Sequence, residues 1–126
     1  MFDYKFFCFN GHVEFLYVMG DRDVGKRVKV SFFDREFRKL SILREGDDEL
    51  NGVTCPLQYS EMVKIAETLS AVFLHVRVDL FNLNGRILFG ELTFYNASSY
   101  MKYKPDSFDL EMGEKWSLPP IMDFLQ

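Results

Sequence analysis

The sequence predicts an α+β domain, in which a mainly antiparallel β-sheet carries one principal packed helix. Aromatic residues are frequent, with 14 Phe and 6 Tyr among 126 residues, and such side chains favour strands and bury large areas. Short β-prone runs stand on both sides of a single stretch with helical periodicity. Residues 1–126 are 48% hydrophobic and 27% charged, which is the balance of one folded domain with one core.

The first strands are predicted at Asp3–Phe9 and His12–Met19. Asn10 and Gly11 separate them, and this dipeptide is a strong hairpin signal because both residues tolerate positive φ. The two strands are therefore expected to be antiparallel neighbours.

A second hairpin is predicted further along the chain. Residues 27–33 alternate as a strand does, Asp34 and Arg35 form a turn, and residues 37–43 return. Residues 45–56 lack periodicity and are rich in Gly, Asp and Asn, so a connecting loop is expected there.

The principal helix is expected to begin at Tyr59 or Ser60. If Ser60 is the N-cap, Glu61 lies in the first turn, beside the positive end of the helix. The apolar face follows the 3.6-residue period and consists of Met62, Ile65, Ala66, Leu69 and Val72. A second, short helix is predicted at about residues 108–116.

Charge and composition exclude several function classes. The formal net charge is −4 and the isoelectric point is about 5.1, which argues against nucleic-acid and anionic-membrane binding. Eight of the fifteen Lys and Arg residues lie between Arg22 and Arg44, as a solvated strand face or as a contact surface for an anionic substrate. The sequence has neither a secretory signal pattern nor an apolar run of ~20 residues, so a cytoplasmic protein is expected.

The cysteines and histidines give no sign of a catalytic or zinc site. Cys8 and Cys55 do not form a CxxC motif and are expected to be free thiols. Neither His12 nor His75 lies beside a Ser or Cys in a nucleophile motif. The chemistry is therefore sought among the carboxylates.

Two acidic residues stand on strands predicted at Val76–Asn82 and Arg86–Phe94, and the register of these strands decides whether they meet. A two-residue turn at Asn84-Gly85 would place Asp79 and Glu91 on opposite faces. A three-residue loop, with Gly85 as a positive-φ bulge residue, would instead pair Asn82 with Arg86.

The three-residue loop is the favoured prediction, because it gives one polar and one apolar face. One face would carry Arg77, Asp79, Phe81, Ile87, Phe89, Glu91 and Thr93. The other would carry Val78, Leu80, Leu88 and Leu92, with Asn82, Arg86 and Gly90. The polar face is expected to be open, and its apolar residues Phe81, Ile87 and Phe89 form a candidate patch for dimerisation or for docking of another lobe.

Two carboxylates side by side repel each other unless a cation or a proton lies between them. Mg²⁺ bound through one or two carboxylates plus substrate phosphates is a common arrangement. The alternative is a surface ion pair between Arg77 and Glu91, with Asp79 solvated. Spacing alone leaves both interpretations open.

At these residues the sequence resembles the TupA-like ATP-grasp family, whose members act in teichuronopeptide and capsular polysaccharide biosynthesis. The likeness is carried by residues 77–80 (RVDL) and 90–95 (GELTFY), and also by residues 3–11 (DYKFFCFNG). It extends through the helix around Met62 to Leu69 and into the tail from Pro105 to Pro119. The ordered set spans nearly the whole chain and resembles the carboxyl-terminal lobe of the ATP-grasp fold.

The resemblance implies Mg²⁺ and ATP as cofactors. It implies that Asp79 and Glu91 are the magnesium ligands, and that Lys5 and Arg77 approach the phosphates or an acyl-phosphate intermediate. Thr93 stands where many ATP-grasp enzymes have an asparagine, so its hydroxyl is a candidate ligand through water. The loop at 96–99 lacks the Pro and Gly that are common there.

The resemblance further implies an amino-terminal nucleotide lobe before Asp3, so the chain is expected to be a partial domain that is inactive alone. One hypothesis is a Mg²⁺- and ATP-dependent carboxylate ligase for a cell-envelope or capsular polymer. Its substrate would be an acidic sugar or an amino acid, bound with a missing lobe, a partner chain or a second copy. The other hypothesis is a non-catalytic module that acts in binding or assembly.

Overall fold

The computed structural model describes residues 1–20, 27–44, 46–94 and 103–104. Within these residues, strands β4 (Lys39–Leu40), β3 (Lys29–Asp34), β2 (His12–Met19), β1 (Asp3–Phe9), β7 (His75–Leu83) and β8 (Arg86–Phe94) lie in that order in one sheet. A seventh strand, β6 (Asp48–Glu49), pairs with β3 in parallel. Strands β5 (Leu43–Arg44) and β9 (Tyr103–Lys104) form a separate pair. The predicted α+β class is confirmed.

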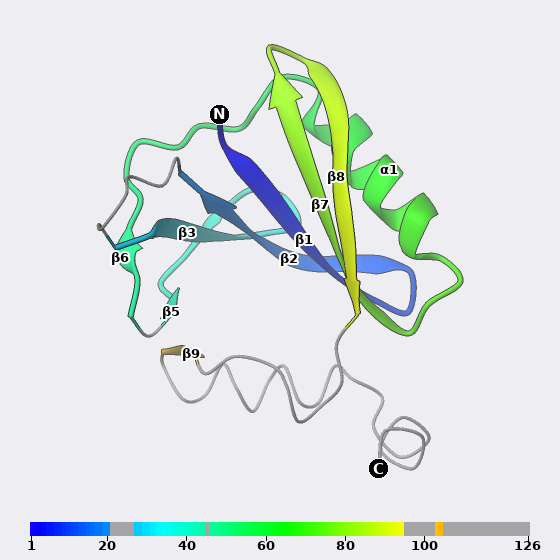
Figure 1. Ribbon diagram of the computed structural model, residues 1–126, viewed down its shortest axis with the longest axis horizontal. Coiled ribbons are helices and arrows are strands. Elements are labelled where there is room, and N and C mark those ends of the chain that lie inside the picture. The colour runs from blue at the N-terminus through cyan, green and yellow to red at the C-terminus, as the bar shows by residue number, and fades with distance from the viewer. Residues whose placement is uncertain (21–26, 45, 95–102, 105–126) are drawn as a thin grey trace.

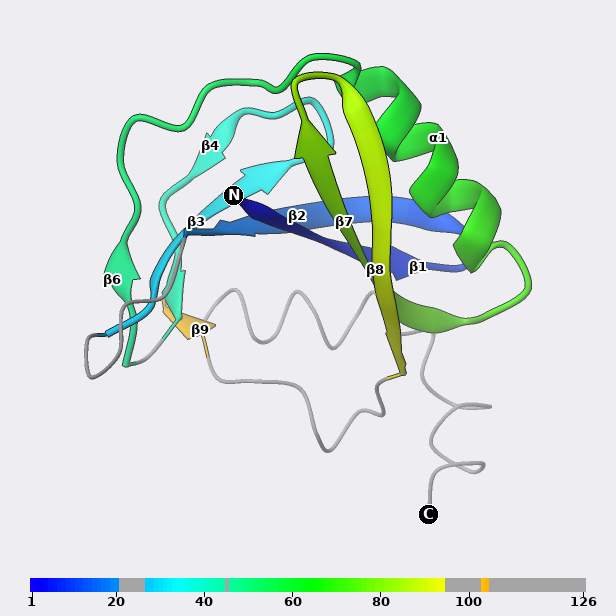
Figure 2. The same ribbon diagram turned by 45° about the horizontal axis from the view of Figure 1, so that its top comes forward.

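One helix, α1 (Tyr59–Ser70), covers one face of the sheet (Figures 1 and 2). The helix begins at Tyr59, one of the two predicted starts, and its N-cap is Gln58, with a left-handed φ of 61°, rather than Ser60. Glu61 lies in the first turn, as expected. The predicted short helix at 108–116 lies outside the described residues.

The apolar face of α1 differs from the periodic prediction at its last turn. The helix buries Met62, Val63, Ala66 and Ser70. Leu69 belongs to the last turn of α1 but is exposed, and Val72 is exposed beyond the end of the helix at Ser70. The helical period therefore predicted the helix correctly, but the last two apolar residues of the predicted face are exposed.

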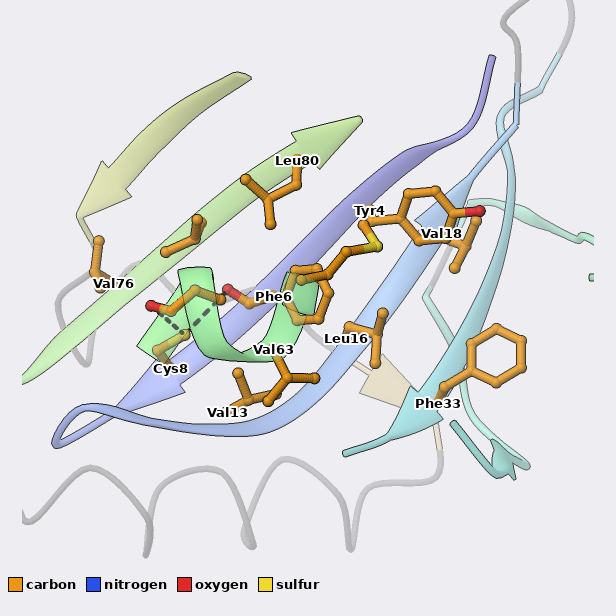
Figure 3. Packing of buried hydrophobic residues seen from close by; sticks show 13 residues of the cluster. Tyr4, Phe6, Cys8, Val13, Leu16, Val18, Phe33, Val63, Val76 and Leu80 are labelled. Atoms are coloured by element: carbon orange, nitrogen blue, oxygen red, sulfur yellow. Dashed lines mark hydrogen bonds between the residues drawn. The ribbon is translucent and has the colours of Figure 1, made fainter. Parts of the chain in front are cut away.

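The core under α1 is continuous from β3 to β7 (Figure 3). Its members alternate along β1 and β7, as a sheet with one face against a helix requires, whereas on β2 the register shift separates Val13 from Leu16 by three residues. They are Tyr4, Phe6, Cys8, Val13, Leu16, Val18, Phe33, Met62, Val63, Ala66, Val76, Val78 and Leu80.

The opposite face of the sheet carries a second buried cluster, which is almost entirely aromatic. Its members are Phe7, Phe9, Phe15, Tyr17, Val30 and Phe32. Phe7 stacks on Phe15 with ring centroids 4.4 Å apart. The many aromatic residues of the sequence are therefore divided between two faces, and strand β1 contributes to both.

The hairpin of β1 and β2 forms as predicted, and its turn residues Asn10 and Gly11 have φ values of 54° and 79°. The second predicted hairpin is wrong beyond its turn, because only Lys39–Leu40 pairs with β3. Asp34 explains the difference: its carboxylate accepts the backbone N–H groups of Glu36 and Arg38 at 3.0 and 2.8 Å. The turn therefore extends to Arg38, and only Lys39–Leu40 of the expected long return strand pairs with β3.

Candidate functional site

The turn between β7 and β8 differs from the favoured prediction. Leu83 pairs with Arg86, so Asn84 and Gly85 form a two-residue turn, with φ values of 53° and 96°. Both residues tolerate positive φ, which a tight hairpin turn requires. The Asn82 side chain also accepts the backbone N–H of Gly85 at 2.7 Å, which stabilises this turn over the expected three-residue loop.

A β-bulge on β8 restores the pairing of Asp79 with Glu91, which the two-residue turn alone would have prevented. Leu80 pairs with Phe89, whereas Asp79 pairs with Glu91, so Gly90 is the extra residue on β8. A two-residue turn without a bulge would have placed Asp79 and Glu91 on opposite faces. The prediction that these carboxylates share a face is confirmed, although its stated cause is wrong.

The bulge also corrects the predicted face of three apolar residues. Between the turn and the bulge, Leu88 pairs with Phe81, and Ile87 with Asn82. Ile87 packs against the core under α1, and Phe89, the partner of Leu80, is 57% exposed. The patch predicted from Phe81, Ile87 and Phe89 therefore does not exist on one face.

Strand β1 brings further charges to this face of the hairpin. Lys5 pairs with Asp79 across the sheet, and Asp3 pairs with Phe81. The Lys5 ammonium lies 2.8 Å from Asp79 Oδ2 and 3.0 Å from Asp3 Oδ2. Lys5, which the sequence connected with phosphate only by resemblance, is therefore in direct contact with the predicted metal ligand.

Arg77 is the cation that the two predicted metal ligands share. Its Nε donates to Asp79 Oδ1 at 2.7 Å, and its Nη2 donates to Asp79 Oδ2 at 3.0 Å. The same Nη2 lies 3.6 Å from Glu91 Oε1 and donates to the Thr93 hydroxyl at 3.2 Å. All five predicted site residues are thus brought together.

We call Asp3, Lys5, Arg77, Asp79 and Glu91 the charge cluster. Three carboxylates and two cations give it a formal charge of −1. Sequence reasoning missed Asp3. The available signal was its position two residues before Lys5, which places both side chains on the same face of a strand.

Burial within the charge cluster is uneven. The side chains of Asp79, Lys5 and Arg77 are 3%, 9% and 12% exposed, whereas that of Glu91 is 65% exposed. The expectation of an open face is correct at Glu91 and wrong at Asp79. The alternative with a solvated Asp79 is wrong too, because β1 and the side chains of Lys5 and Arg77 cover this carboxylate.

The environment of Lys5 favours its charged form. Burial by itself lowers the pKa of a lysine, but the hydrogen bond and the charge of Asp79, with the hydrogen bond to Asp3, outweigh it and raise the pKa of Lys5. The ammonium therefore stays protonated at neutral pH and neutralises buried negative charge.

A small cavity of about 210 Å³ opens beside the charge cluster. It is lined by Asp3, Asp79, Phe81, Gly90 and Glu91. Asp3 Oδ1 is buried and has no hydrogen-bond partner among the described residues. A buried carboxylate oxygen without a donor is costly, so this wall can accept a further cation or N–H donor.

Asp79 and Glu91 remain the predicted ligands of a magnesium ion whose coordination would be completed by a substrate. Within the described residues, no group of three or more His, Cys, Asp or Glu is arranged to hold a metal alone. Mg²⁺ prefers oxygen ligands and commonly takes one or two carboxylates plus phosphates. Asp79 and Glu91 line one cavity and supply such a pair, with Asp3 on the same wall.

The remaining candidate residues lie away from the cluster. Cys8 is buried under α1, where burial raises the pKa of its thiol to about 12, and Cys55 is exposed; both are free, as expected (Figure 3). His12 lies at the exposed β1–β2 turn, 4.0 Å from Glu67. None of these three side chains belongs to the charge cluster.

Comparison with known families identifies the family of the chain. A family model described as TupA-like ATP-grasp matches residues 1–117, so the chain belongs to the TupA-like ATP-grasp family. No curated protein and no solved structure matches the chain. In the described part of the chain, no helix is long and apolar enough to cross a membrane.

The bulge at Gly90 predicts a steric effect of substitution. A Cβ there would lie 2.9 Å from the Asp79 carbonyl oxygen and 3.1 Å from the Phe81 ring, so Gly90→Ala should destabilise the fold by about 1–3 kcal/mol. Urea unfolding measures this change. Gly20→Ala is the control, since its Cβ would meet chiefly the flexible Leu50 side chain, at 3.3 Å. Equal stability of the two variants would contradict a tightly packed bulge.

Removal of the buried carboxylate should be far more costly than removal of the exposed one. Asp79→Ala leaves Lys5 and Arg77 without their shared acceptor and should destabilise the fold by about 3–5 kcal/mol. Glu91→Ala removes a largely exposed side chain and should change the free energy of unfolding by less than about 0.5 kcal/mol. Thermal and urea unfolding compare the two. Similar losses in both variants would show that Asp79 does not hold the cluster together.

Proposed function

We propose that this chain forms the metal- and phosphate-binding part of an ATP-dependent, Mg²⁺-dependent carboxylate ligase. Membership of the TupA-like ATP-grasp family supports the ATP chemistry. The observation that carries the proposal is the cluster itself: Asp79 and Glu91 line one cavity, and two cations contact the Asp79 carboxylate. Carboxylates that bind magnesium and basic side chains that stabilise phosphate charge are the groups that a magnesium-bound polyphosphate requires.

Each residue of the cluster has a role in this proposal. Asp79 and Glu91 would hold Mg²⁺, which would supply charge neutralisation on the phosphate oxygens. Arg77 and Lys5 donate to phosphate oxygens or to an acyl phosphate, and Arg77 already contacts both metal ligands. Thr93 orients Arg77 through its hydroxyl, which accepts from Nη2 at 3.2 Å.

The reaction has two steps. A carboxylate oxygen of the substrate attacks the γ-phosphorus of ATP, the bond from this phosphorus to the bridging oxygen breaks, and ADP leaves. An amine nitrogen then attacks the carbonyl carbon of the acyl phosphate, inorganic phosphate leaves, and the nitrogen loses a proton. Charge on the transferred group is offset by the two basic side chains. An acidic sugar or an amino acid of a cell-envelope or capsular polymer is the proposed substrate, and the nucleotide lobe would complete the site.

A specific observation favours a second candidate, a non-catalytic binding or assembly module. Both oxygens of Asp79 already accept hydrogen bonds from Lys5 and Arg77, so the charge of this carboxylate is compensated without a metal. In that case the cluster would only hold β1, β7 and β8 together. Binding experiments separate the two candidates.

Titration of the chain with ATP in the presence of Mg²⁺ tests the proposed function. The ligase proposal expects a dissociation constant between about 1 μM and 1 mM. Asp79→Asn and Glu91→Gln should each weaken binding tenfold or more, because each removes a metal ligand. Asp48→Asn is the matched control, since Asp48 pairs with Arg27 on a different part of the sheet. Equal binding by all four proteins, or none by the parent chain, would favour the non-catalytic module.

A further inference from the structure

The charge cluster contains an obstacle to metal binding that the proposed function must overcome. Asp79 is buried and accepts three hydrogen bonds, two from Arg77 and one from Lys5. A divalent cation on Asp79 would come close to both positive side chains, and like charges at such distances in a partly buried site repel strongly. At least one basic side chain has to leave Asp79 when the metal arrives.

Lys5 has a second acceptor that is ready to receive it. Its ammonium already lies 3.0 Å from Asp3 Oδ2. Asp3 Oδ1 is buried and accepts no hydrogen bond from any described residue. A carboxylate accepts at both oxygens and an ammonium has three protons to donate, so Asp3 can hold Lys5 with both oxygens once Asp79 is released.

Because of the strand geometry, the Lys5 ammonium has to move only a small distance from Asp79 to Asp3. Asp3 and Lys5 stand two residues apart on β1, with their side chains on the same face, and Lys5 is the cross-strand partner of Asp79. The ammonium contacts Asp3 and Asp79 at once, so a small rotation of a flexible side chain transfers it entirely to Asp3.

We propose that Asp3 is a positioning residue, which retains the Lys5 ammonium at the cavity when a divalent cation binds to Asp79. This inference rests on the proposed function. The formal charge of the cluster then changes from −1 to +1, because the ion adds two positive charges and no basic side chain is lost. A cavity with net positive charge attracts an anionic phosphate, whereas loss of Lys5 to solvent would forfeit one of these charges.

The experiment follows the Lys5 ammonium directly by NMR of ¹⁵N-labelled lysine, with MgCl₂ as the only added ligand. Slow proton exchange makes the ammonium of a buried, hydrogen-bonded lysine observable, and Lys5→Arg identifies the signal by its loss. In the parent chain, Mg²⁺ should shift the Lys5 signal without abolishing it. In Asp3→Asn, the same addition should abolish the signal, because the ammonium has no second carboxylate and moves into water.

Metal affinity gives a second readout. Asp3→Asn should weaken Mg²⁺ binding about threefold to tenfold, because displacing the Lys5 ammonium from Asp79 is more costly when no second carboxylate receives it. Asp3→Glu keeps an acceptor for Lys5 and should restore both the affinity and the ammonium signal. Asp48→Asn controls for the loss of one acidic charge, and dispersed backbone amide signals confirm that each variant is folded.

The outcomes separate this inference from the proposed function. If Mg²⁺ shifts no signal of β7 or β8 in the parent chain, and Asp79→Asn behaves identically, the proposed function fails and this inference fails with it. If Mg²⁺ binds through Asp79 but the Lys5 signal responds alike in the parent chain and in Asp3→Asn, the role of Asp3 alone is refuted. Loss of the Lys5 signal from the parent chain on metal binding would also refute it.

Discussion

Asp79 lies where strands β1, β7 and β8 meet, and its buried carboxylate is neutralised by Lys5 from β1 and by Arg77 from its own strand. A buried charge is tolerated only when it is paired and hydrogen-bonded, so the position of each of these three side chains depends on the other two. Arg77 extends the arrangement to β8 through Glu91 and Thr93. The edge of the sheet is thus joined by charge on one face and by the apolar core on the other.

A buried ion pair contributes little net stability compared with an apolar replacement of the same volume. The cluster therefore costs desolvation energy at a position where aliphatic side chains would serve the fold equally well. This cost is understandable if the same groups bind a charged ligand. The cavity beside Asp3, Asp79 and Glu91 agrees with that interpretation, because it leaves the carboxylate side of the cluster accessible.

Local signals in the sequence predicted much of the fold. The Asn10-Gly11 hairpin, the strand at Arg86–Phe94 and the single long helix all form, because turn dipeptides and periodicity act over a few residues. The long return strand after Asp34 does not form, since the Asp34 carboxylate captures backbone N–H groups that a strand would have used. The pairing of β1 with β7 joins residues that are between 66 (Phe9 with His75) and 78 (Asp3 with Phe81) positions apart, and nothing in the local pattern specifies it.

In the candidate site, too, the local signals were predicted from the sequence and the long-range pairing was not. The sequence indicated that Asp79 and Glu91 meet, but it assigned their register to a bulge at Gly85, whereas the structure has a tight turn at Gly85 and a bulge at Gly90. The turn is one residue shorter than predicted, and the bulge adds one residue to β8, so the two differences cancel at Asp79 and Glu91. The alternation of polar and apolar residues is the same in both arrangements near these carboxylates, so it cannot distinguish them. Asp3 was missed because its importance depends on the β1–β7 pairing, which brings Lys5 to Asp79.

The most direct test of the account is a crystal structure of the chain with Mn²⁺ and a non-hydrolysable ATP analogue, in which anomalous scattering locates the metal. We expect the manganese peak at the carboxylates of Asp79 and Glu91, with the Lys5 ammonium on Asp3 and Arg77 turned toward the phosphates. A structure in which the analogue and the metal bind elsewhere, while Lys5 and Arg77 still enclose Asp79, would contradict the account and identify the cluster as a purely structural ion pair.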